Sequence, residues 1–189
     1  MTNHKVKPLL VTMTLLILSV SAWASEFSPE GAKRIDDFLA RIARRRNPSI
    51  FLKKMTFNEL ELNSYMNLIY IKKYAPEVSF IQLSVKPKNQ VSGTLKLQLK
   101  EKQYEQVPAF LRDVEVRFAG QIECANYRMR FLFQQLVING SQFSPEIVDE
   151  AFALAQPGGK AKRSIYDWFS FLPGLKSIQT GDKSISLLY

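Results

Sequence analysis

Histidine is almost missing from this chain of 189 residues, which has one, at position 4. His4 lies in an N-terminal segment that we expect to be removed, so the mature chain would have no imidazole. Without imidazole a Ser-His-Asp or Cys-His catalytic site is excluded, and the commonest transition-metal ligand is lacking. Most classes of hydrolase and metalloenzyme are therefore poor candidates.

Cysteine is equally scarce, because Cys124 is the only one. No disulfide can form within the chain, even in a compartment that favours disulfides, and we interpret Cys124 as a small buried residue. The sequence also lacks the patterns G-x-G-x-x-G, G-x-x-x-x-G-K and G-x-S-x-G, which mark phosphate-binding loops and a catalytic serine.

The carboxylates that come nearest to a catalytic constellation are Glu59 with Glu61 and Glu146 with Asp149 and Glu150. Both groups lie at expected helix starts, where acidic residues stabilise the positive end of the helix dipole. We therefore interpret them as structural, and we expect a protein that is not an enzyme and has no cofactor or metal.

The first 24 residues have the pattern of a secretory signal peptide. Lys5 and Lys7 precede an apolar stretch over 8–20, and Ser-Ala-Trp-Ala at 21–24 supplies a cleavage site. The stretch is shorter than the roughly 20 apolar residues that span a bilayer, so cleavage near Ala24 is favoured over a retained anchor. We expect a periplasmic or secreted protein in which residues 25–54 form an N-terminal amphipathic basic helix and linker, and residues 55–189 form one domain.

Positive charge dominates, with 26 Lys and Arg against 17 Asp and Glu. Much of the excess gathers shortly after the expected cleavage site and suits lipid headgroups or another anionic membrane surface. The candidate residues are Arg41, Arg44, Arg45, Arg46, Lys53 and Lys54. A solvated helix end explains the same residues equally well. Nucleic acid is not an expected partner, because no motif for reading it occurs.

Periodic apolar residues predict two early helices. Ser28-Pro29-Glu30 is typical of a helix start, and an apolar stripe from Ile35 to Ile42 indicates a helix that packs on the domain or lies on a membrane, packing being favoured. Thr56 and Glu59 have the spacing of a capping box, which predicts a second helix over 59–71. Its expected polar side carries Glu59, Glu61, Asn63 and Asn67.

The centre of the chain alternates apolar and polar residues with a period of two. This predicts a hairpin of 80–86 with 91–100, a strand that ends in a turn at Gly120, and one long strand over 121–138. Ser144-Pro145 then starts a helix, and a last hairpin pairs 176–179 with 184–189. The fold class is predicted to be α+β, with a long curved antiparallel sheet wrapped around helices.

These strands offer many large apolar residues, and the helices expected from the sequence are short. The candidate lining of an apolar groove is Leu95, Leu97, Leu99, Tyr127, Met129, Phe131 and Phe133. An ordinary packed core explains the same pattern.

Three stretches resemble the small bacterial envelope proteins of the TULIP (tubular lipid-binding) superfamily. Residues 56–65 are similar to the helix that opens such domains, 137–145 to their strand running into a proline-started helix, and 172–178 to the entry of their last hairpin. The loop at 158–163, rich in Gly and Lys, departs from the family pattern. The likeness covers 55–189, and it implies a curved sheet around a long helix and an apolar groove for acyl chains.

The leading hypothesis is a lipid-binding or lipid-shuttling protein of the periplasm that takes a phospholipid or fatty acid. The alternative is an envelope interaction or assembly factor with a dry core, which would hold a protein partner through exposed aromatic residues. The candidates for that surface are Tyr166, Trp168, Phe169 and Phe171.

Overall fold

The computed structural model describes residues 27–44, 52–98, 113–154 and 164–189. Arg45, Arg46 and Leu99, named above, lie outside them. In chain order the elements are α2 (Pro29–Ala43), β1 (Lys54–Asn58), α3 (Glu59–Tyr65), the π-helix η1 (Met66–Tyr70), α4 (Ile71–Tyr74), β2 (Val78–Lys86), β3 (Gln90–Gln98), β4 (Asp113–Ala125), β5 (Arg128–Ile138), β6 (Ser141–Phe143), α5 (Pro145–Leu154), β7 (Phe169–Ser170), β8 (Ser177–Gly181) and β9 (Ser184–Leu188).

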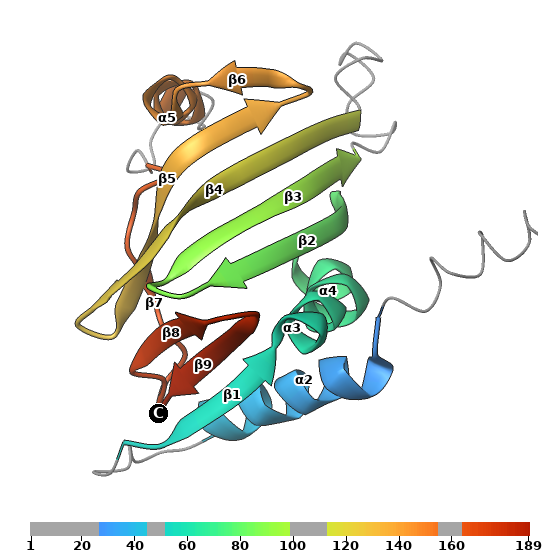
Figure 1. Ribbon diagram of the computed structural model, residues 1–189, viewed down its shortest axis with the longest axis vertical. Helices are drawn as coiled ribbons and strands as arrows, with labels where there is room; N and C mark the ends of the chain where they lie inside the picture. Colours follow the sequence, from blue (N-terminus) through green and yellow to red (C-terminus); the bar gives the residue numbers. More distant parts are fainter. Residues whose placement is uncertain (1–26, 45–51, 99–112, 155–163) are drawn as a thin grey trace, which may run out of the picture.

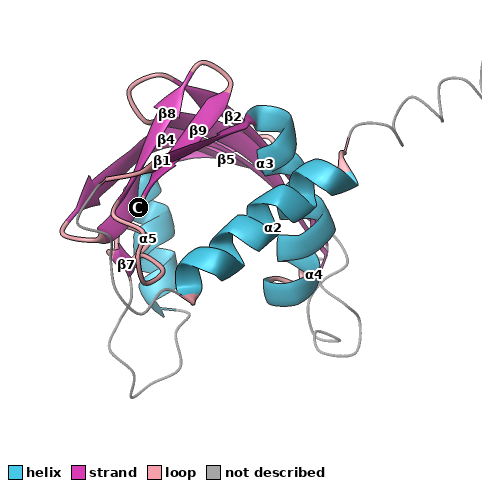
Figure 2. Cartoon of the chain, turned by 90° about the horizontal axis from the view of Figure 1, so that it is seen from below, coloured by secondary structure: helices cyan, strands magenta, loops and turns pink. Residues whose placement is uncertain are grey.

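The helices and two antiparallel sheets confirm the α+β class. The larger sheet has the order β2-β3-β4-β5-β6, with β7 also paired to β5, and the smaller has the order β1-β9-β8 (Figure 1). Figure 2 shows α2, α4 and α5 on the same side of the large sheet. The two sheets are joined by backbone hydrogen bonds, such as the one that the Lys183 N–H donates to the Val85 carbonyl over 3.2 Å.

The hairpins predicted at each end of the strand region are confirmed. β2 pairs with β3 around a turn in which Lys88 and Asn89 have positive φ, and β8 pairs with β9. The helix predicted from Ser144-Pro145 is α5, with the proline at its first position. These elements depend on local signals, alternation and turn or cap residues, which are visible in the sequence.

The turn predicted at Gly120 is wrong. β4 continues through Gly120 to Ala125, and the chain reverses at Asn126 and Tyr127, whose φ angles are 50° and 59°. Two consecutive residues of positive φ give the twist that a tight antiparallel hairpin needs. The single strand predicted over 121–138 is therefore the end of β4, this turn and β5.

Gly120 is required by close approach of the neighbouring strand. A Cβ at this position would lie 2.2 Å from the carbonyl oxygen of Leu132 and 2.7 Å from Cε1 of Phe131. The strand register also shifts between Ala119 and Gly120, which marks a β-bulge. A glycine within an alternating strand thus marks crowding here.

The capping box predicted for Thr56 and Glu59 is also wrong. Thr56 lies in β1, and its hydroxyl oxygen is 2.9 Å from that of Ser186 in β9. The box is formed by Asn58 and Glu61: the Glu61 N–H donates to Asn58 Oδ1, and the Asn58 N–H donates to Glu61 Oε2, each over 2.8 Å. The partner strand of β1 comes from the far end of the chain, so no local pattern reveals it.

Helix α2 packs into the core, as favoured from the sequence. Ser28 caps it, accepting a hydrogen bond from the Gly31 N–H over 3.0 Å. The buried stripe consists of Ala32, Ile35, Phe38 and Ile42, each at most 4% exposed. They join buried residues of both sheets in one cluster, so residues 29–43 and the strands share a hydrophobic core.

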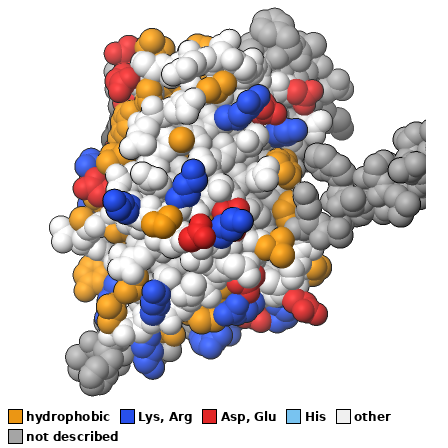
Figure 3. All heavy atoms as spheres, viewed as in Figure 1, with side chains coloured by type: hydrophobic (Ala, Val, Ile, Leu, Met, Phe, Trp, Pro, Cys, Tyr) orange, Lys and Arg blue, Asp and Glu red, His pale blue; other side chains and the backbone are white. Residues whose placement is uncertain are grey.

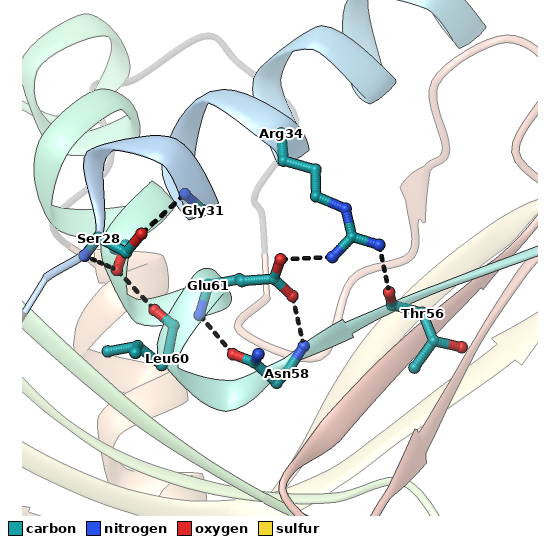
Figure 4. A network of polar contacts seen from close by, with 8 residues as sticks. Ser28, Gly31, Arg34, Thr56, Asn58, Leu60 and Glu61 are labelled. Atoms are coloured by element: carbon teal, nitrogen blue, oxygen red, sulfur yellow. Dashed lines mark hydrogen bonds and ion pairs between the residues drawn. The ribbon is translucent and has the colours of Figure 1, made fainter.

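A polar network fastens α2 to α3 and β1 (Figure 4). The Arg34 guanidinium pairs with the Glu61 carboxylate and also donates to the Thr56 carbonyl over 3.4 Å. At the start of α2, the Ser28 N–H donates to Ser64 Oγ over 2.8 Å. Because Ser64 is fully buried, this last contact fixes the helix start at a solvent-free point.

The outer edge of β2 is covered by side chains of the helical segment that precedes it in the chain. Glu59, Asn63 and Asn67 lie four residues apart and therefore on one helix face. Four residues of a helix rise about 6 Å and two residues of a strand about 6.6 Å, so the two repeats match. The three side chains bond to the backbone of Val85, Leu83 and Ile81 in turn.

Candidate functional site

One face of the large sheet is apolar and points toward the helices. Val85, Val91 and Ile122 on this face belong to the core cluster with α2 and the small sheet. Since side chains alternate between faces, Leu95 and Leu97 share the face of Val91. Met129 and Phe131, paired with Cys124 and Ile122, lie on it too and pack against the core.

A row of aromatic rings crosses this apolar face. Phe118 on β4 lies 5.6 Å from Phe131 on β5, measured between ring centroids, and Phe131 lies 4.6 Å from Phe133. Tyr166, from the segment after α5, extends the row at 6.4 Å from Phe133. All three contacts are edge-on, a favourable geometry for aromatic pairs, and all four rings are half-buried.

The predicted groove residues share a face but form two groups along it. Phe133 pairs with Gly120, which pairs with Val91, whereas Leu95 lies four residues further along β3, about 13 Å away along the strand. Leu95 and Leu97 instead lie opposite Val116 and Val114. All four of these aliphatic residues are half-buried.

Tyr127 does not join either group. It occupies the turn between β4 and β5 with 65% of its surface exposed. The sequence pattern assigned it to the face of Met129 because the turn was expected at Gly120 instead.

Sequence reasoning missed Phe118 and Tyr166 as members of the aromatic row. Phe118 was placed in a strand that ended at Gly120, although the alternation continues through Ile122 to Cys124 in β4. Tyr166 has no periodic signal, since it lies outside any helix or strand. Burial raises the pKa of the Tyr166 phenol, and the nearby carboxylates Glu146 and Asp149 raise it further.

The opposite face of the large sheet is polar and open to solvent. In Figure 3 most of this face is white, the colour of the backbone and of side chains that are neither charged nor hydrophobic. An open pocket of about 470 Å³ lies here, lined among others by Gln82, Ser92, Thr94 and Arg117. The predicted groove residues have the opposite orientation on their strands.

The predicted cationic residues are exposed where the structure describes them. Arg41 and Arg44 lie at the end of α2, and Lys53 and Lys54 lie at the start of β1.

Some of the aromatic residues named for the alternative hypothesis are packed, and others are exposed. Phe169 is 55% exposed, whereas Tyr166 and Phe171 pack against the row and the core. The Trp168 ring lies beneath the Arg130 guanidinium, 4.7 Å from its carbon.

Three of the acidic residues singled out from the sequence make structural contacts. Glu61 accepts a hydrogen bond from the Asn58 N–H at the start of α3, Glu59 accepts one from the Val85 N–H in β2, and Asp149 Oδ1 accepts one from the Ile165 N–H over 2.7 Å. Among residues 27–44, 52–98, 113–154 and 164–189, no group of three or more His, Cys, Asp and Glu is placed to hold a metal ion. None of the helices described there is long and apolar enough to cross a membrane.

Comparison of the chain with protein-family models, with curated proteins and with solved structures finds no match.

Proposed function

We propose that this protein binds a phospholipid or fatty acid, holding the acyl chain against the apolar face of the large sheet, and that it shuttles or stores lipid in the periplasm without catalysing a reaction. The proposal includes a TULIP-like arrangement in which the sheet curves around the helices. It also includes export by the N-terminal signal.

The observation that carries the proposal is the half-buried apolar surface on β3 and β4. Leu95, Leu97, Val114 and Val116 retain partial exposure, although they lie on the face that elsewhere forms the core. An acyl chain placed there would remove this apolar area from water, at about 25 cal/mol per Å². The aromatic row of Phe118, Phe131 and Phe133 lies further along the same face and adds to its apolar surface.

The alternative, an envelope interaction or assembly factor with a dry core, is favoured by a different observation. Tyr127 and Phe169 are both exposed near the same end of β5, where β7 pairs with β5 and the Phe171 N–H donates to the Tyr127 carbonyl over 3.0 Å. Exposed aromatic residues are typical of protein interfaces.

Mass spectrometry tests the proposal directly. The mature protein, residues 25–189, is purified from the export compartment without detergent, weighed in its native state and then extracted with organic solvent. A stoichiometric phospholipid or fatty acid supports the proposal. A protein that carries no lipid and takes up none from offered phospholipid or fatty acid contradicts it and favours the alternative.

Adjacent residues of β3 provide a matched pair of variants. Leu97→Glu places a charge on the apolar face, and Gln98→Glu places the same charge on the opposite face of the same strand. We expect the first variant to lose lipid and the second to keep it. A folded Leu97→Glu protein, checked by circular dichroism, that still carries lipid would contradict the proposed site.

A further inference from the structure

Two segments that are separate in the sequence place their cationic side chains at one end of the molecule. The Phe38 ring of α2 contacts the Tyr189 ring, with centroids 5.1 Å apart, and the Lys53 N–H donates to the Tyr189 carbonyl over 2.8 Å. The last turn of α2 and the first residues of β1 therefore lie together at the chain's C-terminal residue (Figure 1). We call this region the basic end and define it by Arg41, Arg44, Lys53, Lys54, Leu52 and Leu172.

The positive charge of the basic end is not neutralised by acidic neighbours. Some cations elsewhere are paired, as in Lys33 with Asp37 and Arg34 with Glu61. In contrast, the two arginines and two lysines of the basic end are exposed and form no ion pair within the described parts of the chain. The sequence has no Asp or Glu over 38–58 or over 168–181, so cationic side chains predominate here and attract an extended anionic surface.

Exposed leucines accompany these cations. Leu52, next to Lys53, is 60% exposed, and Leu172 is 44% exposed. Leu172 belongs to a turn that packs on the end of α2, since a Cβ on Gly174 would lie 3.1 Å from Cγ2 of Ile42. Exposed apolar side chains surrounded by Lys and Arg are the composition with which proteins lie on the interface of an anionic bilayer.

We propose that the basic end docks on the surface of an anionic phospholipid bilayer. The arginines and lysines contact headgroup phosphates, and Leu52 and Leu172 enter the boundary between headgroups and acyl chains. This inference rests on the proposed lipid-binding function, since it makes the bilayer the donor or acceptor of the bound lipid. It adds an orientation, with the end of α2 and the start of β1 toward the membrane.

Binding of the mature protein to vesicles tests this proposal. Vesicles of phosphatidylglycerol and phosphatidylethanolamine are compared with vesicles of phosphatidylcholine in a flotation assay. We expect binding to the anionic vesicles, and we expect most of it to disappear near 1 M salt, where the Debye length falls to about 3 Å. Equal binding to both kinds of vesicle, or binding to neither, overturns the proposal.

A pair of double variants locates the contact. Arg41→Glu with Arg44→Glu reverses two charges at the end of α2, and Lys72→Glu with Lys73→Glu reverses two exposed charges in the last turn of α4. Both double variants change the net charge by the same amount, and both place two carboxylates at a helix C-terminus, where the helix dipole disfavours negative charge. Since each cation near an anionic membrane contributes about 1 kcal/mol, we expect at least a tenfold loss of vesicle affinity in the α2 variant only. Equal losses in both would overturn the proposal.

The leucines and the cargo are tested separately. Leu52→Ser with Leu172→Ser is expected to weaken vesicle binding at least threefold while leaving its salt dependence intact, and unchanged affinity would contradict the insertion of these side chains.

Lipid content, measured by extraction, distinguishes this proposal from the proposed function. A protein that carries lipid but ignores vesicles overturns only the docking proposal, whereas one that binds vesicles but carries no lipid overturns only the groove.

Discussion

The side-chain amide of Asn63 completes the hydrogen bonding of Leu83 on the edge of β2. Its Nδ2 donates to the Leu83 carbonyl over 2.8 Å, and its Oδ1 accepts from the Leu83 N–H over 2.7 Å. The amide thus occupies the place that a further strand would take. An open strand edge is a site for unwanted pairing between chains, and this helix closes it.

Asn63→Ala is therefore expected to destabilise the protein and expose the edge. Loss of two partly buried hydrogen bonds corresponds to about 2 kcal/mol in the free energy of unfolding, measured by urea denaturation. Gln142→Ala, at an exposed position on β6, is the control and should change stability by less than about 0.5 kcal/mol. An unchanged midpoint for Asn63→Ala would contradict the role given to the amide.

Gly120→Ala tests the crowding between β4 and β5. The added methyl would overlap backbone as well as the Phe131 ring, so we expect a loss of about 3 kcal/mol or more, or failure to fold. Gly140→Ala is the control: its φ of 82° strains alanine, but no atom lies within 4 Å of the added Cβ. A cost of about 1 kcal/mol is expected there. Similar costs at both positions would contradict the steric account.

The strand prediction failed at Gly120 for a reason that follows from this crowding. Glycine in an alternating sequence has two physical explanations, a turn or a close approach, and only the position of the neighbouring strand distinguishes them. Likewise Thr56 and Asn58 are both good helix caps. Pairing of residues 54–58 with β9 keeps Thr56 within a strand, so Asn58 becomes the cap. Elements set by local signals, such as α2, α5 and the β2–β3 hairpin, were predictable.

The candidate site was predictable to the same extent. The alternation of apolar and polar residues correctly predicted that one face of the sheet carries Leu95, Leu97, Met129, Phe131 and Phe133. It did not give the register between strands, which separates the leucines from the aromatic row. The residues Asn63 and Asn67 were predicted only as part of the polar side of a helix, although their spacing of four matches the repeat of an adjacent strand edge.

Tyr65 makes stability depend on alkaline pH. Burial, followed by Asp36, Tyr74 and Tyr70, raises the pKa of its phenol from 10.0 to about 12. The folded state therefore holds this proton more tightly than the unfolded chain, and the contribution is complete below pH 10 and lost between pH 10 and 12. We expect a loss of about 2 kcal/mol over that range, and a smaller loss in Tyr65→Phe.

Denaturation by urea at pH values from 9 to about 12 checks this prediction. Tyr127→Phe, at an exposed position, is the control and should follow the native protein. If Tyr65→Phe loses as much stability across the range as the native protein, another group is responsible.

Glu61→Ala should loosen the attachment of α2. The carboxylate serves two partners, the Asn58 N–H at the start of α3 and the Arg34 guanidinium on α2. Loss of the capping bond and the ion pair is expected to cost about 2 kcal/mol and to raise the rate of proteolysis within residues 29–43. Glu30→Ala, exposed in the first turn of α2, should have an effect of a few tenths of a kcal/mol. Equal effects of the two substitutions would argue against the network in Figure 4.

If the protein carries lipid as proposed, removal of that lipid should lower thermal stability through mass action, because a ligand of the folded groove does not bind the unfolded chain. We expect the melting temperature of the native protein to fall after organic extraction and refolding, and to recover when the extracted lipid is returned. The melting temperature of Leu97→Glu should change neither on extraction nor when the lipid is returned. A native protein whose melting temperature is the same with and without its lipid would contradict binding at a preformed site.

The strand pairing of the small sheet sets the order in which parts of this protein can fold during synthesis. β1 pairs with β9, and the hydroxyl contact between Thr56 and Ser186 spans 130 residues. A contact of such sequence separation cannot form until residue 186 has left the ribosome, and long-range strand pairing is slow. Because Ile185 and Leu187 of β9 belong to the same core cluster as the buried residues of α2, that core is completed only after β9 has been synthesised.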